Sequence, residues 1–377
     1  MIQSPSHAGA VLTIDLDAIV GNYCLLRERA GRASCAAVVK ADAYGLGAVH
    51  VAPTLAAAGC RQFFVAHLDE AITLRPHLPA HTEVFVLHGP PPGSDAEFLQ
   101  HRLIPVLNGS TQLAAWRRLA QRENRRLPAI VQVDTGMARL GLSPDEVDAW
   151  LAMPDCLEGI ELRYLMSHLA CAEQQEHPMN RIQLDRFNAF RARLPACAAS
   201  FANSSGIFLG PDFHFDLVRP GAALYGVAPI DGAANPMQSV VRLQGRIIQT
   251  RTIAAGDCVG YGARYRSAGA ARIATVAVGY ADGWLRNASN RGVAFIDGIE
   301  VPQVGTISMD TITLDVSAID PARALPGMAV DLISPENPID AVAARAGTIG
   351  YEILTSLGVR YQREYIGGSG GQAARCA

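Results

Sequence analysis

Residues 35–45 read Cys-Ala-Ala-Val-Val-Lys-Ala-Asp-Ala-Tyr-Gly. The run from Cys35 to Val39 is apolar, as in a buried strand, and a loop of mostly small residues follows Lys40. Lys40 is the only lysine among the 32 basic residues of the chain. An ε-amine can lose its proton and form an imine with an aldehyde, whereas a guanidinium stays protonated. A single lysine retained by chance could lie anywhere, so its place at a strand end indicates a catalytic amine.

Short apolar runs like this one alternate with helical stretches from about residue 10 to residue 235. Segments such as 48–58, 110–122 and 178–193 have the apolar spacing of helices packed on one face. Eight strands with intervening helices predict an α/β fold, specifically a (β/α)8 TIM-type barrel. A doubly wound sheet is the alternative, but no G-x-G-x-x-G follows the first strand. The predicted strands are 35–40, 61–66, 83–88, 103–107, 128–134, 158–167, 197–202 and 214–218.

The pattern changes after Pro236, where short β-branched runs are separated by glycine-containing turns. This predicts an all-β domain with one helix near residues 339–346. We therefore expect two domains, a barrel over 10–235 and a C-terminal β-domain over 236–372, to which residues 1–9 add a strand. The predicted strands of the β-domain are 240–253, 271–278, 293–296, 301–307, 311–316 and 329–333.

Composition favours an ordinary globular protein, with 49% hydrophobic residues, 18% charged residues and a net charge of −3. The charge gives no reason to expect nucleic acid or an anionic membrane as a partner. No run approaches the ~20 apolar residues that span a bilayer, and the N-terminus does not resemble a secretory signal. The eight cysteines form no C-x-x-C pair. We expect reduced thiols, no metal site and a cytoplasmic location.

Polar segments cluster where the predicted barrel strands end. Each has an ordinary explanation by itself: Asp134-Thr135-Gly136 as a capped turn, His168 as a structural histidine, and Arg219 as the partner of a carboxylate. The loop 203–206, Asn-Ser-Ser-Gly, is only a weak phosphate-binding signal. Because the carboxyl ends of barrel strands meet at one mouth, the segments together indicate an active site there.

The string Val-Val-Lys-Ala-Asp-Ala-Tyr-Gly at 38–45 resembles the cofactor-lysine signature of the alanine racemases. Further matches preserve the family's order and spacing across both predicted domains, so the resemblance covers nearly the whole chain. It implies a pyridoxal 5'-phosphate enzyme with a barrel and a β-domain. The matching segments are 134–142, 166–170, 203–204, 219–221, 261–265, 279–283, 308–310 and 351–353.

The resemblance implies that Lys40 holds the cofactor and exchanges the Cα proton of the D-isomer. Tyr261 from a partner subunit would act on the opposite face, for the L-isomer. A racemase needs two bases on opposite faces of one planar centre, so a lysine and a tyrosine from different domains are a coherent pair. The enzyme would be a homodimer with active sites shared between subunits, and its substrate would be L- or D-alanine.

The remaining roles also follow from the resemblance. Arg219 would face the pyridine nitrogen and limit side reactions, and His168 would bridge Arg219 and Tyr261. The phosphate would be held by Tyr44, Ser204, Tyr351 and the backbone of Gly221 and Ala222. The full implied set of cofactor-binding residues is Lys40, Tyr44, His168, Asn203, Ser204, Arg219, Gly221, Ala222 and Tyr351. The substrate carboxylate would bind Arg139 and the backbone of Met309, and the entrance would be narrowed by Tyr265 and Tyr280.

Three positions depart from the family pattern. Gln132 stands where some members carry a carbamylated lysine, so an amide or a bound anion must position Arg139. Leu46 replaces a histidine, and Arg264 adds a cation beside Tyr265. The alternatives are a broader racemase for serine and alanine and a non-catalytic cofactor-binding protein. D-Alanine would serve peptidoglycan synthesis, or the reverse reaction would serve its catabolism.

Overall fold

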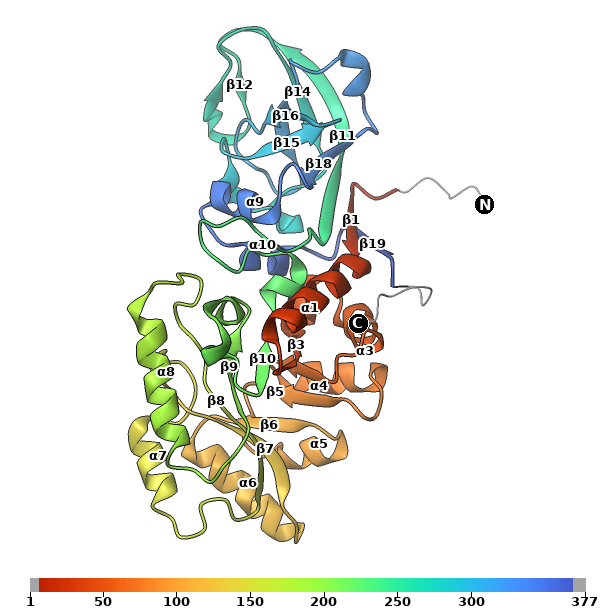
Figure 1. The fold of residues 1–377 in the computed structure, drawn as a ribbon. Coiled ribbons are helices and arrows are strands. Elements are labelled where there is room, and N and C mark those ends of the chain that lie inside the picture. The colour runs from red at the N-terminus through yellow and green to blue at the C-terminus, as the bar shows by residue number, and fades with distance from the viewer. Residues whose placement is uncertain (1–6, 369–377) are drawn as a thin grey trace. The chain divides into compact units, whose positions relative to one another are not determined.

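The structure, a computed structural model, describes residues 7–368 and is drawn in Figure 1. Its packing divides the chain into two compact units. The first comprises residues 19–224 and 228–237, and the second comprises residues 7–18, 225–227 and 238–368.

The first unit is a parallel barrel, which confirms the predicted fold class. Its nine strand segments pair in the order β2-β10-β9-β8-β7-β6-β5-β4-β3. β2 pairs with β10 and β3 with β4, and only Ala36 separates β2 from β3. The two halves of one split strand therefore bring the ends of the sheet together. The segments are β2 (Ser34–Cys35), β3 (Ala37–Val38), β4 (Gln62–Val65), β5 (Glu83–Val86), β6 (Ile104–Leu107), β7 (Leu127–Gln132), β8 (Ile160–Met166), β9 (Ala199–Asn203) and β10 (Leu217–Arg219).

Helices between the strands cover the outside of the barrel (Figure 1). On α6 the buried residues Leu113, Trp116 and Leu119 recur at helical spacing, which gives the helix one apolar face. Inside the barrel, Phe64 and Phe85 stack with ring centroids 4.7 Å apart. The helices are α1 (Leu16–Ala30), α2 (Lys40–Gly45), α3 (Ala48–Ala57), α4 (Leu68–Leu74), α5 (Asp95–Gln100), α6 (Ser110–Arg122), α7 (Pro144–Leu151) and α8 (Pro178–Arg191).

The second unit is built around the long strand β11 (Val241–Ile253), which pairs with β1, β14 and β18. Gly245 lies on β11 where this strand pairs with both β1 and β18, and a Cβ there would come within 2.5 Å of the Val276 side chain. The other elements are β1 (Ala10–Asp15), β12 (Cys258–Val259), β13 (Tyr265–Arg266), β14 (Ala271–Val276), β15 (Val293–Ile296), β16 (Ile299–Pro302), β17 (Ile312–Asp315), β18 (Ala329–Ile333), α9 (Ile339–Ala346), α10 (Gly350–Ser356) and β19 (Gln362–Ile366).

The chain ends differ from the sequence prediction. The strand that joins the second unit is β1 at residues 10–15, paired with β11 and, in parallel, with β19. Residues 10–15 had been assigned to the barrel and the extra strand to residues 1–9, of which residues 1–6 lie outside the described part of the chain. The sequence analysis did not predict α10 and β19.

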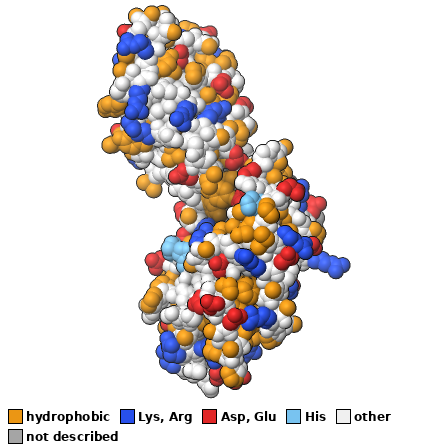
Figure 2. All heavy atoms as spheres, turned by 90° about the vertical axis from the view of Figure 1, so that its left-hand side faces the viewer, with side chains coloured by type: hydrophobic (Ala, Val, Ile, Leu, Met, Phe, Trp, Pro, Cys, Tyr) orange, Lys and Arg blue, Asp and Glu red, His pale blue; other side chains and the backbone are white. Residues whose placement is uncertain are grey.

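Six cysteines of the described residues are free thiols, namely Cys35, Cys60, Cys156, Cys171, Cys197 and Cys258. Acidic and basic side chains are interspersed over the face drawn in Figure 2, in keeping with the small net charge. Over residues 7–368, the helices are too short or too polar to cross a bilayer.

Candidate active site

Lys40 lies at the start of α2, and the backbone after it turns the wrong way for an ordinary helix. Residues 41 to 44 have φ values of 52°, 54°, 54° and 56°, which is one left-handed turn built without glycine. Such a conformation costs about 1–2 kcal/mol per residue. The predicted strand 35–40 is present as β2 and β3 but ends two residues early, at Val38, and the segment predicted as a loop is this left-handed turn.

The ε-amine of Lys40 is partly buried at the mouth of the barrel. Burial and the nearby Arg139 guanidinium lower its pKa, and the Glu70 carboxylate opposes them. A lowered pKa leaves more of the amine unprotonated near neutrality, which an amine nucleophile requires.

Arg219, at the end of β10, is 4% exposed and has only neutral partners. Its guanidinium donates to Ser200 Oγ at 2.5 Å and to the carbonyl oxygens of Ser167 and Phe201 at 2.8 and 3.4 Å. Within residues 7–368 no carboxylate lies within ion-pair distance of it, so the ordinary explanation by a carboxylate partner is wrong. Burial lowers the pKa of Arg219 to about 9, which leaves the group charged at neutral pH.

His168 lies beside Arg219, with its Nδ1 3.3 Å from the guanidinium Nη2. A guanidinium can only donate, so Nδ1 accepts and the neutral ring carries its proton on Nε2. Burial, with Arg219, Arg139 and Lys40 nearby, holds the pKa of His168 well below its ordinary value. The ring is therefore a neutral Nε2–H donor.

Backbone N–H groups converge on Ser204 after β9 and β10. Gly221 and Ala223 donate to its hydroxyl oxygen at 2.9 and 3.2 Å. The buried N–H of Ala222 has no acceptor among the described residues. A Cβ on Gly221 would lie 2.4 Å from the Tyr44 hydroxyl, so only glycine leaves room for it. Convergent N–H donors beside hydroxyls are a cradle for an anion such as phosphate.

The Asn203 amide, unlike Ser204, caps its own loop: its Oδ1 accepts from the Gly206 N–H at 2.8 Å.

Arg139 projects from a tight loop after β7. Asp134 Oδ1 accepts from the N–H groups of Gly136 and Met137 at 2.8 and 2.9 Å. Gln132 donates its amide to the Leu140 carbonyl at 3.1 Å, so it fixes the loop backbone one residue beyond Arg139. The Arg139 guanidinium itself is exposed and has no hydrogen bond or ion pair among residues 7–368.

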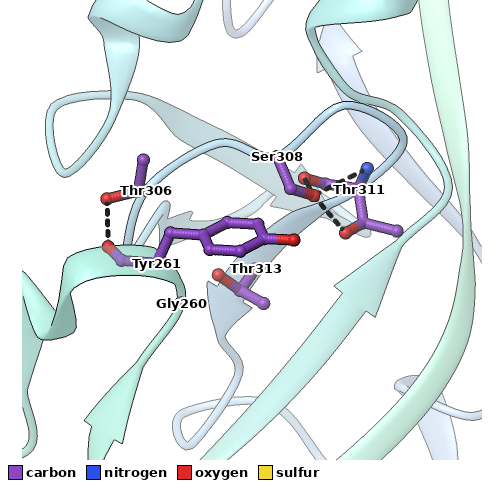
Figure 3. A pocket seen from close by; sticks show the side chains of 6 residues that line it. All are labelled: Gly260, Tyr261, Thr306, Ser308, Thr311 and Thr313. Carbon is purple, nitrogen blue, oxygen red and sulfur yellow. Dashed lines mark hydrogen bonds between the residues drawn. The ribbon is translucent and has the colours of Figure 1, made fainter.

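In the second unit, the side chain of Tyr261 is 72% exposed. It borders a pocket of about 470 Å3 lined by hydroxyl residues, and Figure 3 shows its ring extending over that pocket toward Thr311. The buried Thr306 donates its hydroxyl to the Tyr261 carbonyl at 2.9 Å. The backbone on both sides is in the positive-φ region at Gly260 and Gly262.

Two loops of the same unit meet backbone to backbone. Tyr280 N–H donates to the Ser308 carbonyl at 3.0 Å and Ala281 N–H to the Met309 carbonyl at 2.9 Å. A Cβ on Gly279 would lie 2.3 Å from the Met309 oxygen, so this approach needs glycine. Met309 and Tyr280 are exposed, and the Met309 N–H has no acceptor among the described residues.

Three further sequence-predicted positions lie elsewhere in this unit. Tyr265, on β13, packs against the buried cluster of Val259, Ala271, Ile273 and Val304. Tyr351 is half-buried on α10, and Arg264 is exposed. The structure thus gathers Lys40, Tyr44, Arg139, His168, Asn203, Ser204, Arg219, Gly221 and Ala222 in the barrel unit, and Tyr261, Tyr265, Tyr280, Met309 and Tyr351 in the other.

Sequence reasoning missed Glu70 and Thr306, which hold the backbone beside Lys40 and Tyr261. Glu70 is the third residue of α4 and hydrogen-bonds to the N-cap backbone, so its helix-start position was the available signal. A threonine in a β-rich segment carries no comparable signal.

The chain matches the N-terminal domain of alanine racemase over residues 14–229 and its C-terminal domain over residues 240–365. It is 52% identical to the alanine racemase of Rhodospirillum rubrum, over 96% of this chain and 97% of that protein. It is 50% identical to the catabolic alanine racemase of Mesorhizobium japonicum, over 97% of this chain and 95% of that protein.

Solved structures of alanine racemases are similar to this chain over nearly its whole length. The alanine racemase of Bartonella henselae with covalently bound pyridoxal phosphate has a TM-score of 0.92 and 45% identity, covering 95% of this chain and 100% of that chain. The biosynthetic alanine racemase of Pseudomonas aeruginosa has a TM-score of 0.89 and 35% identity, covering 96% of this chain and all of the other.

The barrel and the β-domain, together with these relatives, place the protein in the class of pyridoxal-phosphate-dependent isomerases. Within that class, the chain belongs to the alanine racemase family.

The neutral state of His168 predicts a pH-dependent stability. Below its ordinary pKa of about 6.5 the unfolded chain binds a proton that the folded chain does not, so stability falls as pH decreases. In His168→Gln this contribution is absent. Between about pH 7.5 and pH 5.5, the free energy of unfolding of the wild type should fall by up to about 1.4 kcal/mol per pH unit more than that of the variant.

Denaturant titrations of both proteins, in the same state of cofactor loading, measure this difference. Parallel pH profiles for the two proteins would contradict the prediction, because they would show that His168 binds its proton equally well in the folded and the unfolded chain.

Proposed function

We propose that this protein interconverts L- and D-alanine, with Lys40 and Tyr261 as the two bases. The observation that carries the proposal is the pairing, in one barrel unit, of the chain's only lysine, at a lowered pKa, with a buried arginine that has only neutral partners. The lysine suits an aldehyde cofactor, and the arginine, which has no carboxylate partner among the described residues, suits an acceptor atom on a bound group.

The residues present fit pyridoxal phosphate. Its phosphate would be held by the Ala222 N–H, which lacks an acceptor, together with Ser204, Tyr44, Tyr351 and Gly221. Its ring nitrogen would accept from Arg219, and its aldehyde carbon would bond to Lys40. When bound, the cofactor supplies an electron-withdrawing ring that acidifies the Cα–H of the amino acid attached to it.

The amine of Lys40 would take or return the Cα proton on one face. Tyr261 would do so on the other face, so that a proton removed by one base and delivered by the other inverts the centre. We assign Tyr261 to a partner subunit, in a homodimer with shared active sites. Tyr261 is 72% exposed in a single chain, which supports this assignment. A tyrosine that acts as a base would be expected to be shielded from solvent, and a partner subunit could provide that shielding.

His168 would prepare Tyr261 for this role. A phenol with an ordinary pKa of about 10 is a poor base near neutrality. The Nε2–H of a neutral His168, fixed in that tautomer by Arg219, would donate to the phenolate oxygen and stabilise it. The permanent charge of Arg219 would stabilise the same oxygen through the ring.

The substrate carboxylate would bind Arg139, whose guanidinium has no partner among the described residues, and the Met309 N–H. Tyr265 and Tyr280 would narrow the entrance and favour a small side chain. In a cell the product D-alanine would serve peptidoglycan synthesis. Similar proteins carry both the descriptions catabolic and biosynthetic, so degradation of D-alanine is the second use we consider. The cytoplasmic location remains a prediction.

Borohydride reduction of the holoenzyme tests the cofactor assignment. Because Lys40 is the only lysine, peptide mapping should place a single reduced cofactor adduct on the peptide that contains it. A colourless protein that shows no adduct after incubation with pyridoxal phosphate would overturn the proposal.

Tyr261→Phe tests the two-base assignment. Racemisation should fall by about 10²–10⁴-fold, because one face loses its acid or base. Exchange of the Cα hydrogen of D-alanine with deuterium should continue, since Lys40 remains, while exchange of L-alanine should be lost. Proton NMR in deuterium oxide measures both. Equal loss of exchange from the two isomers would contradict the assignment of faces.

Mixing Lys40→Ala and Tyr261→Phe subunits tests whether the sites are shared. Each variant alone should be inactive, whereas a mixed dimer contains one site with both bases. Random pairing should restore activity on the order of one quarter of the wild type. No recovery after denaturation and refolding of the mixture would show that both bases come from one chain. Wild type refolded in parallel is the control.

A further inference from the structure

The left-handed turn at residues 41–44 requires support from outside itself, because alanine and tyrosine do not favour that conformation. Within the segment, Ala43 N–H donates to the Val39 carbonyl and Ala48 N–H to Asp42 Oδ1, at 2.9 and 2.7 Å. These bonds join the turn to its own ends. They do not fix its direction relative to the rest of the barrel.

A carboxylate on the neighbouring helix provides one bond from outside the turn. Glu70, on α4, accepts from the Ala41 N–H through Oε1 at 2.6 Å. Ala41 is the residue directly after Lys40, so this bond holds the first peptide beyond the lysine.

The second oxygen of the same carboxylate anchors it. Glu70 Oε2 accepts from the N–H groups of Ala66 and His67, at 2.7 and 3.0 Å, in the loop between β4 and α4. One side chain therefore joins the loop after β3 to the loop after β4. Both oxygens must be acceptors, which an ionised carboxylate satisfies and an amide of the same length does not.

The charge of Glu70 also acts on the amine. The titratable groups that interact with Lys40 are Arg139, His88, His168 and Glu70. Glu70 is the only acid in this set. It opposes the lowering of the Lys40 pKa by burial and by Arg139.

We propose that Glu70 is a positioning residue of the lysine site, whose carboxylate fixes the strained turn that directs Lys40 and places the compensating negative charge beside it. This inference rests on the proposed function only in taking Lys40 as the working amine.

Three variants of the full-length chain test the proposal. Glu70→Gln keeps the side-chain length but loses the charge and one acceptor, and Glu70→Asp keeps the charge but is one methylene shorter. Glu146→Gln is the matched control. Glu146 is likewise the third residue of its helix, α7, and its carboxylate accepts from Ser143 and Ser110 N–H at 3.0 and 3.1 Å, so it also joins two loops.

The first measurement is amide hydrogen exchange at Ala41. Loss of a hydrogen bond to a charged acceptor should accelerate exchange there by about tenfold or more in Glu70→Gln and in Glu70→Asp. Glu146→Gln should leave Ala41 at the wild-type rate and accelerate exchange at Ser110 instead.

The second measurement is the pH dependence of amine modification at Lys40 in protein freed of cofactor, read by mass on the only lysine peptide. Glu70→Gln should move the midpoint to lower pH by roughly half a unit to one unit. Glu70→Asp, which retains the charge, should stay closer to the wild type, and Glu146→Gln should not differ from it.

Wild-type rates at Ala41 together with an unmoved midpoint in Glu70→Gln would overturn the inference. If that variant does not fold, Glu70→Asp decides through its exchange rate at Ala41. Neither readout involves the bound cofactor or turnover, so a failure here is distinct from the absence of a reduced adduct on Lys40, which would overturn the proposed function.

Discussion

The closure of the parallel sheet at residues 34–38 is the constraint on which the rest of the barrel site depends. A split strand pairs with β10 on one side and with β4 on the other, so the first and last strands become neighbours. Because all the strands run in one direction, the loops after them open at the same mouth. Lys40 and Arg219, 179 positions apart in the sequence, belong to one site for this reason. An open sheet would place them at opposite edges.

At this mouth of the barrel, basic side chains outnumber acidic ones. Arg219 is compensated only by neutral oxygens and a ring nitrogen, which keeps His168 neutral and fixes its tautomer. Arg139 adds a second cation, and together with burial it lowers the pKa of Lys40. Glu70 is the acid that opposes this effect, and it does so with both oxygens engaged by backbone N–H groups. An anionic cofactor and an anionic substrate suit a site with this balance of charge.

The barrel strands were predictable because each is a short apolar run bounded by turn residues, and β5 begins at the predicted residue, Glu83. The importance of Lys40 was predictable because it is the only lysine in the sequence. The turn after Lys40 was not, since alanine and tyrosine have no intrinsic preference for positive φ, and a bond from Ala41 to Glu70 on α4 helps to hold it there. β19 was missed for a similar reason: its polar residues form a strand because they pair with β1.

The possession of one lysine has a chemical consequence for the whole molecule. Most proteins of this size expose many surface amines, which take up reactive carbonyl compounds and acylating metabolites before these reach a buried group. In this chain every other basic side chain is a guanidinium or an imidazole, so Lys40 is the only side-chain amine available to them. No other lysine of the chain competes with Lys40 for such reagents. Covalent damage of that type falls on Lys40, the amine that we propose holds the cofactor.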